Sequence, residues 1–153
     1  MKILMVCLGN ICRSPLAEGI LEQKIQQHDL DWQVDSAGTG FWHIGEPPDH
    51  RSMKVARNHG IDISGQRARQ FSTEDFDNFD LLLAMDESNK KDMLRLAQND
   101  AHAEKVKLIL DYDAAFFGTK DVPDPYYDGK FEYTFDLLAT ACEKLLAYYH
   151  VTH

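Results

Sequence analysis

The first fifteen residues predict a strand, a tight loop and a helix in immediate succession, which restricts the chain to folds built from such units. Ile3-Leu4-Met5-Val6 is a short apolar run without glycine or proline, typical of a buried strand. Ser14-Pro15 is typical of a helix start, with serine as N-cap and proline in the first turn, and the helical pattern continues to Gln27. Cys7 to Arg13 must therefore turn sharply at the carboxyl end of a strand.

Apolar β-type runs alternate with helical patterns along the rest of the chain, which predicts an α/β fold with a mostly parallel sheet flanked by helices. We expect four strands, near Lys2 to Cys7, Trp32 to Ser36, Asp80 to Met85 and Lys105 to Leu110. We expect helices at Pro15 to Gln27, Pro48 to Asn58, Glu87 to Ala97 and Tyr133 to Tyr149. Asp86 is the expected N-cap of the third helix, and Gly60 the expected residue just beyond the second. Without repeats or low-complexity tracts, residues 1–153 are expected to form a single domain.

Composition argues against several classes of function. The net charge of −9 disfavours nucleic acid as a ligand, because binding to a phosphate backbone needs clustered cations. The early apolar stretch from Ile3 to Leu8 is too short for a signal-peptide core or a membrane span, so we expect a cytoplasmic protein with no membrane partner. The three cysteines lack the spacing of a disulfide framework or a zinc site, and we expect neither a metal nor a cofactor.

The loop after the first strand has the features of a phosphate-binding loop. Its amides cannot all pair with a strand or a helix, Gly9 and Asn10 permit a positive φ, and the helix N-terminus adds partial positive charge. Arg13 offers a planar fork for two phosphate oxygens. The same field favours the thiolate of Cys7, the nucleophilic form of cysteine. The predicted loop consists of Leu8, Gly9, Asn10, Ile11, Cys12, Arg13 and Ser14.

The stretch CLGNICRSP, at the beginning of the chain, closely resembles the low-molecular-weight protein tyrosine phosphatases, and the resemblance extends from the first strand to the last helix. It implies a Rossmann-like fold of the phosphatase I type. It also implies hydrolysis of phosphotyrosine and aryl phosphates through a cysteinyl phosphate on Cys7, without a metal. The implied partner is a phosphotyrosine-containing protein, and the implied state is a monomer or weak dimer.

Asp124 is the candidate general acid. An aryl oxygen that leaves phosphorus needs a proton, and Asp124 stands between two prolines that restrict the direction of its carboxyl group. On this segment alone a rigid turn is the commoner explanation. The resembled family takes its acid from a late Asp-Pro pair followed by aromatics, and Asp124-Pro125-Tyr126-Tyr127 matches that pattern. Asp121 and Asp128 are weaker candidates. The predicted catalytic residues are thus Cys7, Arg13 and Asp124.

Three segments are expected near the Cys7 loop because they follow the other predicted strands: residues 36–45, 85–88 and 111–127. From these segments and the loop, we expect apolar walls for an aromatic ring at Leu8, Trp42, Tyr126 and Tyr127, although ordinary packing also explains each of them. Phe41, His43 and Glu46 are expected to influence the choice of substrate.

The resemblance also implies supporting residues around the loop. Asn10 would hold its shape, Ser14 would donate a hydrogen bond to the thiolate, and Ser36 would be a partner of Asn10. A histidine that often joins this network is missing, because Ser64 to Arg67 offers only Gln66. Left-handed backbone at Asn10 and helix capping by Ser14 are alternative explanations.

The remaining cysteines and charged segments receive less specific predictions. Cys12 could form a disulfide with Cys7 under oxidation, or be a small apolar loop residue. Cys142 lies in an apolar helical pattern and is expected in the core. The acid-rich segment Ser72 to Asp80 is expected to be a solvated face, and His59 to lie at a helix C-terminus.

Three other functions compete with a tyrosine phosphatase. An arsenate reductase would use the same loop but needs further cysteines, and residues 85–98 contain none. A protein-arginine phosphatase commonly has threonine where Ile11 stands, and smaller residues after the Asp-Pro pair. A phosphotyrosine-binding module without activity would be expected to lose the nucleophile or the acid, whereas Cys7 and Asp124 are both present.

Overall fold

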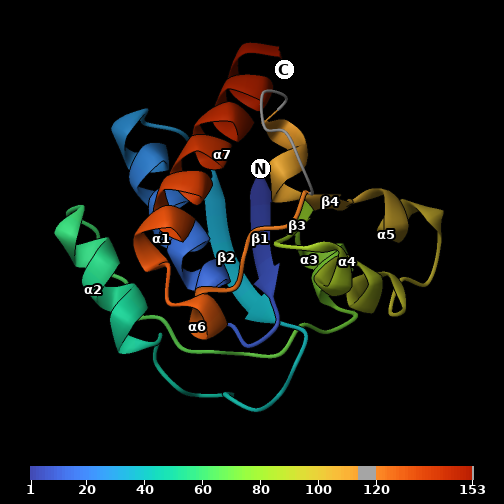
Figure 1. Cartoon of the computed structure of the whole chain (residues 1–153). Coiled ribbons are helices and arrows are strands. Elements are labelled where there is room, and N and C mark those ends of the chain that lie inside the picture. Colours follow the sequence, from blue (N-terminus) through green and yellow to red (C-terminus); the bar gives the residue numbers. More distant parts are fainter. Residues whose placement is uncertain (114–119, 153) are drawn as a thin grey trace.

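The computed structural model describes residues 1–113 and 120–152 and contains a four-stranded parallel sheet in the order β2-β1-β3-β4 (Figure 1). The strands are β1 (Lys2–Cys7), β2 (Gln33–Gly38), β3 (Leu81–Ala84) and β4 (Val106–Leu108). The chain moves from β1 outward to β2 and then returns to the other side of β1. The strand order therefore reverses beside β1, and ligands of such sheets bind at the carboxyl ends of the strands near this reversal.

Helices cover both faces of the sheet, which explains the uninterrupted apolar strands. On one face, α1 (Arg13–Gln27) and α7 (Phe131–Thr152) pack side by side, with α2 (His50–Asn58) beside them (Figure 1). On the other lie α3 (Asp75–Asn78), α4 (Glu87–Leu94) and α5 (Asp100–Glu104). Two short helices complete the described elements, the 3₁₀ helix η1 (Ile109–Tyr112) and α6 (Pro125–Asp128).

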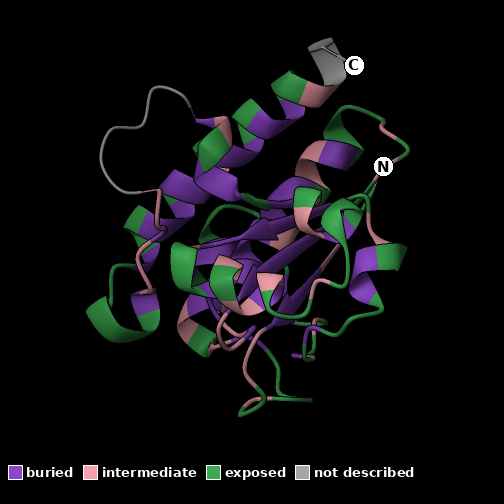
Figure 2. Ribbon diagram, turned by 90° about the vertical axis from the view of Figure 1, so that its right-hand side faces the viewer, coloured by how far each residue is buried: buried purple, intermediate pink, exposed green. Residues whose placement is uncertain are grey.

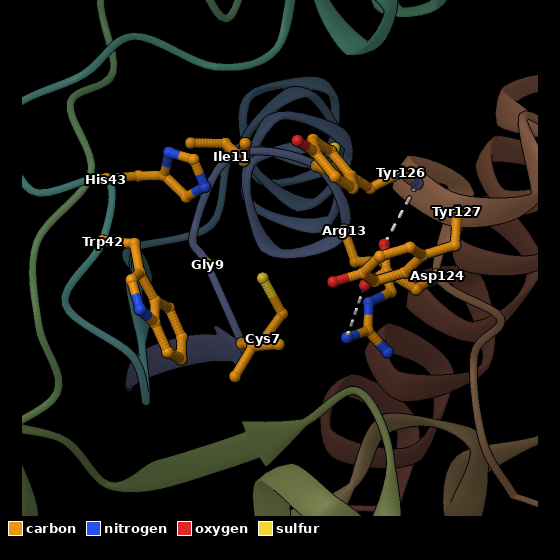
Figure 3. Close-up of a pocket in the computed structure, with 11 residues that line it drawn as sticks. Cys7, Gly9, Ile11, Arg13, Trp42, His43, Asp124, Tyr126 and Tyr127 are labelled. Atoms are coloured by element: carbon orange, nitrogen blue, oxygen red, sulfur yellow. Dashed lines mark hydrogen bonds and ion pairs between the residues drawn. The ribbon is translucent and has the colours of Figure 1, made fainter.

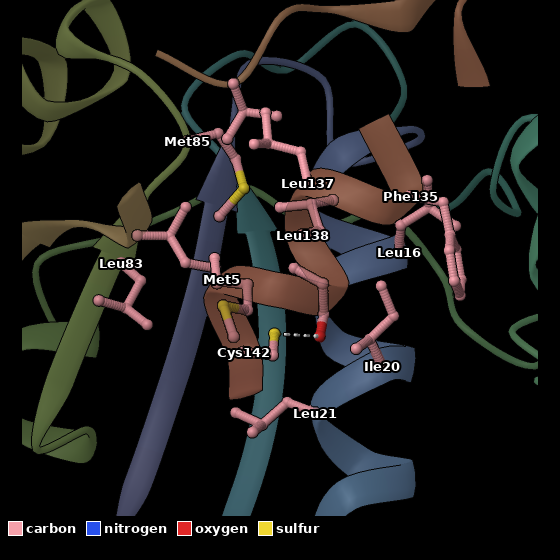
Figure 4. Close-up of a cluster of buried hydrophobic side chains, with 14 of the residues drawn as sticks. Met5, Leu16, Ile20, Leu21, Leu83, Met85, Phe135, Leu137, Leu138 and Cys142 are labelled. Carbon is pink, nitrogen blue, oxygen red and sulfur yellow. Dashed lines mark hydrogen bonds between the residues drawn. The ribbon is translucent and has the colours of Figure 1, made fainter. Parts of the chain in front are cut away.

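Successive residues of β1 serve two different cores. Ile3 and Met5 point toward α1 and α7, whereas Leu4 and Val6 belong to the smaller cluster under α3 and α4. Buried residues fill the space between the layers, and exposed ones lie on the outer helix surfaces (Figure 2). The larger cluster includes Cys142, whose thiol lies 4.0 Å from the carbonyl oxygen of Ala17 (Figure 4). The prediction of a core position for Cys142 is confirmed.

Several predicted boundaries change for identifiable reasons. β2 continues to Gly38 because its small residues allow pairing up to Cys7. β4 ends at Leu108, where the carboxylate of Asp111 accepts the Leu108 amide at 3.1 Å and turns the chain into η1. The N-cap of α1 is Cys12 and not Ser14 as predicted. No side chain makes a capping hydrogen bond at this end of the helix. Asp86 and Gly60 lie at helix ends as predicted, with Gly60 at φ +78°.

Most of the segment Ser72 to Asp80 is a solvated face, as its acidity predicts, since residues 72–74, 77, 78 and 80 are exposed. Its two buried residues lie in α3. Asp75 is 4% exposed, and both its oxygens accept hydrogen bonds from Arg69, each 3.1 Å long. Phe76 is fully buried against Phe71. The helix that starts at Glu87 ends at Leu94, and the unpredicted α5 follows, capped by Asn99. Within residues 1–113 and 120–152, no helix is both long and apolar enough to cross a bilayer.

Candidate active site

A cavity of about 230 Å³ opens at the carboxyl end of β1, beside the reversal of strand order. Figure 3 shows Cys7 between two groups of side chains, with Trp42 and His43 on one side and Asp124, Tyr126 and Tyr127 on the other. Both groups come from segments that the sequence predicts at this edge of the sheet, residues 36–45 and 111–127. Residues 114–119 of the expected segment 111–127 lie outside the described residues.

The loop from Leu8 to Cys12 turns its carbonyl groups outward. The amides of Thr39 and Gly40 donate to the carbonyls of Cys7 and Leu8 at 2.9 and 2.8 Å, and the Asp49 amide donates to that of Ile11 at 2.8 Å. In the part of the chain that the structure describes, the backbone amides of Leu8, Gly9, Ile11 and Cys12 donate to no other residue. Such inward amides beside a helix N-terminus form an anion-binding cradle.

Close approach of β2 to this loop depends on glycine. A Cβ added at Gly38 would lie 2.8 Å from the carbonyl oxygen of Leu8 and 3.1 Å from atoms of Asn10. A Cβ at Gly40 would lie 2.0 Å from the ring of Trp42. The loop and its neighbouring aromatic wall therefore occupy positions that only glycine at 38 and 40 leaves free.

The Cys7 thiol receives hydrogen bonds and is 3% exposed. The Asn10 amide donates to Sγ at 3.3 Å, which the left-handed φ of +58° at Asn10 makes possible. Ser14 Oγ lies 3.0 Å from the same sulfur. The first turn of α1 thus presents Ser14 to the thiol instead of using it as a cap.

Arg13 is buried beneath the cavity and is held by two acceptors. Its Nη1 donates to Asp86 Oδ2 at 2.6 Å and to the Val122 carbonyl at 2.9 Å. Burial works against the charge, but the negative charges of Cys7, Asp86 and Asp124 together keep the pKa of Arg13 above its ordinary value. The other Oδ of Asp86 caps α4 through the Asn89 amide at 2.7 Å. One carboxylate therefore starts a helix and orients the guanidinium.

Asp124 lies at the mouth of the cavity, opposite the loop (Figure 3). Its Oδ2 is 3.6 Å from Arg13 Nη2, and its Oδ1 accepts the Tyr126 amide at 3.1 Å as the N-cap of α6. The segment Pro123-Asp124-Pro125 is therefore the beginning of helix α6 and not a simple turn. Asp121 and Asp128, the weaker candidates, accept the amides of Glu87 and Lys130 instead, each at 2.8 Å.

The aromatic residues predicted as walls line the cavity together with Leu8 and Ile11. Trp42 is 63% exposed and stacks on Phe41, with ring centroids 5.4 Å apart. Tyr126 is 45% exposed, and the guanidinium of Arg51 lies 5.6 Å from its ring centre. Rings that stay this exposed in a monomer are available to contact a ligand.

A hydrogen-bonded network supports the loop from behind. Asn10 Nδ2 donates to Ser14 Oγ at 2.8 Å and to Ser36 Oγ at 2.9 Å, an arrangement consistent with the partners expected for Asn10. Gln66 does not join this network, because its amide donates to the Pro15 carbonyl at 3.1 Å. Glu18 takes part instead, accepting from Ser36 Oγ at 2.6 Å.

Cys7 and Cys12 are both free thiols in this structure. Burial raises the pKa of Cys12 to about 12, so its thiol is protonated at neutral pH. The disulfide between them stays a prediction. Cys142 lies in the core, away from the cavity lining, and does not supply the further cysteine that an arsenate reductase needs.

His43, one of the residues expected to influence the choice of substrate, lines the cavity and contacts Glu46 at 2.6 Å through its ring. The sequence interpretation missed the contributions of Asp86 and Glu18. The sequence predicts Asp86 only as a helix cap, although it lies in the segment 85–88 that is expected at this edge of the sheet. No motif marks Glu18, one of several acidic residues on a long helix.

Comparison with known proteins supports the geometry. Residues 2–152 match the family described as low molecular weight phosphotyrosine protein phosphatase. The chain is 44% identical over 150 residues to the Bacillus subtilis low molecular weight protein-tyrosine-phosphatase YfkJ, an alignment that covers 95% of this chain and 94% of YfkJ. The YfkJ crystal structure superposes with a TM-score of 0.93, covering 99% of this chain and 96% of that one.

Two further solved structures are similar. A protein tyrosine phosphatase from Entamoeba histolytica is 37% identical, with a TM-score of 0.92 and coverage of 99% and 98% of the two chains. A Drosophila arginine phosphatase is 33% identical, with a TM-score of 0.88 and coverage of 97% and 98%. From the match along nearly its whole length, the chain belongs to the low molecular weight phosphotyrosine protein phosphatase family.

Proposed function

We propose that this phosphatase hydrolyses phosphotyrosine in proteins by two successive transfers of the phosphoryl group, with Cys7 as nucleophile and Asp124 as general acid and base. The observation that carries the assignment is the convergence of a hydrogen-bonded thiol, a buried arginine and a carboxyl group on one cavity.

In the first step, the Cys7 thiolate attacks phosphorus in line with the tyrosine oxygen. The S–P bond forms while the P–O bond breaks, and Asp124 gives its proton to the departing phenolate oxygen. The free amides of the loop and the fork of Arg13 stabilise the charge spread over the three remaining oxygens. Because Asp86 and Val122 hold Arg13 from behind, its orientation is set before a ligand binds.

In the second step, water attacks phosphorus and the P–S bond breaks. Asp124, now a carboxylate, takes a proton from the attacking water, and the thiolate of Cys7 is regenerated. The net reaction consumes one water and releases tyrosine and inorganic phosphate. Both proton transfers use the same carboxyl group at the cavity mouth.

Selectivity for an aromatic phosphate follows from depth. The thiol lies at the base of the cavity, and Trp42 and Tyr126 form exposed walls above it. A phenyl phosphate spans this depth with its ring between the walls, whereas the shorter side chain of phosphoserine does not. The likeness to an arginine phosphatase makes phosphoarginine the second substrate to test. Ile11 and the two tyrosines favour phosphotyrosine over that alternative.

The test is hydrolysis of phosphotyrosine, phosphoserine and phosphoarginine peptides in EDTA. We expect turnover of phosphotyrosine, none with Cys7→Ser, and a loss of roughly 10²- to 10⁴-fold in kcat with Asp124→Asn. The loss should be much smaller for an aryl phosphate whose leaving group is already a weak base, because that oxygen needs no proton. Asp128→Asn is the matched control, since the Asp128 carboxylate accepts the Lys130 amide outside the cavity.

An equal loss of rate for good and poor leaving groups in Asp124→Asn would overturn the role of Asp124 as acid. Phosphoarginine turnover above that of phosphotyrosine would move the substrate assignment to the alternative. No turnover of any phosphopeptide by the reduced protein would overturn the proposal as a whole.

We further propose a cytoplasmic enzyme that acts as a monomer or weak dimer on phosphoproteins, without nucleic-acid or membrane partners. The three free, buried thiols and the net charge of −9 support this assignment. Sedimentation of the reduced protein over a range of concentrations tests the oligomeric state, and a stable dimer at nanomolar concentration would contradict it.

A further inference from the structure

A continuous chain of hydrogen bonds connects the Cys7 thiol to Glu18, in the second turn of α1. Sγ of Cys7 lies 3.0 Å from Ser14 Oγ, which accepts from Asn10 Nδ2 at 2.8 Å. The same amide nitrogen donates to Ser36 Oγ at 2.9 Å, and Ser36 donates to Glu18 Oε1 at 2.6 Å. Four contacts therefore link the reacting sulfur to one carboxyl group on the far side of the loop.

The Arg69 amide fixes the direction of the two bonds that Asn10 makes in this chain. The backbone amide of Arg69 donates to Asn10 Oδ1 at 3.0 Å, so both Nδ2 hydrogens of Asn10 point to the two serine hydroxyls. Ser14, which accepts from Asn10, has its own proton free to donate to the Cys7 thiolate at 3.0 Å, a shorter contact than the 3.5 Å to the Ala37 carbonyl. Ser36, which also accepts from Asn10, gives its proton to Glu18.

Glu18 has no cation of its own within 4 Å among residues 1–113 and 120–152. It lines a second cavity, of about 440 Å³, between α1 and residues 60–66. The charged groups around it are Glu22 on α1, Asp35 on β2, Asp62 across the cavity, and Arg69. Burial and the two nearest carboxylates raise the pKa of Glu18 to about 7, while Ser36 and Arg69 act in the opposite direction.

We propose that Glu18 is a positioning residue for the phosphoryl transfer, and that the loss of its proton tightens the hold on Asn10 and thereby on the Cys7 nucleophile. The proposal rests on the assigned role of Cys7. The second cavity gives Glu18 access to solvent protons, so the carboxyl group can follow the pH of the medium without any change at the active-site cavity.

The two protonation states differ in what they offer Ser36. An ionised Glu18 accepts strongly from the Ser36 hydroxyl, which makes Ser36 Oγ a better acceptor for Asn10. A protonated Glu18 accepts only as a neutral group, and the contact to Asn10 weakens with it. Asn10 contacts Cys7 twice, through its own amide and through Ser14, so its position decides how well the thiolate is stabilised.

The test compares wild type with Glu18→Gln, which keeps the shape and acceptor but removes the charge, for kcat on a phosphotyrosine peptide across pH 5.5–8.5. We expect similar rates at pH 5.5, where the wild-type Glu18 is protonated and position 18 is uncharged in both proteins. At pH 8.5, where Glu18 is ionised, we expect the variant to be about tenfold slower than wild type. The ratio of the two rates should change around neutral pH, with little change in KM.

Two further variants separate positioning from general effects. Glu22→Gln removes a neighbouring charge of the same cavity that makes no contact with Ser36, and should leave the ratio flat. In a Ser36→Ala background the link is cut, and Glu18→Gln should then have no further effect on kcat. Thermal unfolding at both pH values shows whether each variant is folded.

Alkylation of Cys7 by iodoacetate, followed by peptide mass spectrometry, tests the inference without a phosphorylated substrate. We expect slower alkylation in Glu18→Gln than in wild type at pH 8.5 and equal rates at pH 5.5. If the protein does not hydrolyse phosphotyrosine but shows this difference in alkylation, the proposed function is contradicted while the role of Glu18 in positioning Cys7 is supported. Identical pH profiles of wild type and Glu18→Gln in folded protein, or the same change in Glu22→Gln, would overturn the role of Glu18.

Discussion

Asp86 shows how one side chain sets the geometry of another at this site. Its Oδ2 holds the buried Arg13 at 2.6 Å while Oδ1 caps α4. We expect Asp86→Asn, which retains the cap, to cost about 1.5 to 3 kcal/mol of transition-state stabilisation, or roughly 10- to 160-fold in kcat/KM. Asp92→Asn, which affects only an exposed pair with Arg95, is the control. Steady-state kinetics with equal kcat/KM for both variants would contradict this role.

Gly40 carries a second prediction at the scale of one residue. Because its Cβ would lie 2.0 Å from the Trp42 ring, Gly40→Ala must displace that wall. We expect KM for a phosphotyrosine peptide to rise by roughly fivefold, equivalent to about 1 kcal/mol of aromatic contact. The inhibition constant of inorganic phosphate should stay unchanged, because phosphate contacts the loop only. Gly65→Ala, where a Cβ meets nothing within 4 Å, should change neither value.

At the scale of elements, the sequence predicted what is local and missed what is distant. The strand, loop and helix that hold Cys7 and Arg13 are consecutive, so motif and periodicity were enough. The bond between Arg13 and Asp86 joins residues 73 apart, and that between Ser36 and Glu18 joins residues 18 apart. Such pairs form only when strand order and helix packing bring the two residues together, and neither can be predicted from a local sequence pattern. Short elements such as α3 and α5 were missed because they have too few residues to show periodicity.

The unpredicted α5 makes a test at this scale. Asn99 caps it by accepting the His102 amide at 2.8 Å. We expect Asn99→Ala to lower the free energy of unfolding by about 1 kcal/mol, and Asn99→Asp to restore most of it because aspartate also caps. Urea denaturation measures both. The catalytic rate should not change, since α5 lies on the opposite face of the sheet from α1.

For the whole molecule, Glu18 connects stability to pH. Its pKa rises from 4.5 in the unfolded chain to about 7 in the fold, so the native state binds the extra proton between these values. Stability therefore falls as pH increases through this window. Allowing for partial exposure, we expect Glu18→Gln to be more stable than wild type by about 1 to 2 kcal/mol at pH 8, and equal near pH 4. Urea titrations at both pH values check the sign, and a variant less stable at pH 8 would contradict it.

The backbone carbonyls that accept hydrogen bonds from the amides of Thr39, Gly40 and Asp49 affect how the enzyme loses activity when it is heated or treated with urea. Because these bonds connect the loop to β2 and to the start of α2, the loop is as rigid as the scaffold before any substrate arrives. A site of this kind cannot melt ahead of the molecule, unlike one carried on a hinged lid. Heating should therefore remove catalysis and tertiary structure at one temperature, and sub-denaturing urea should leave the surviving folded molecules fully active.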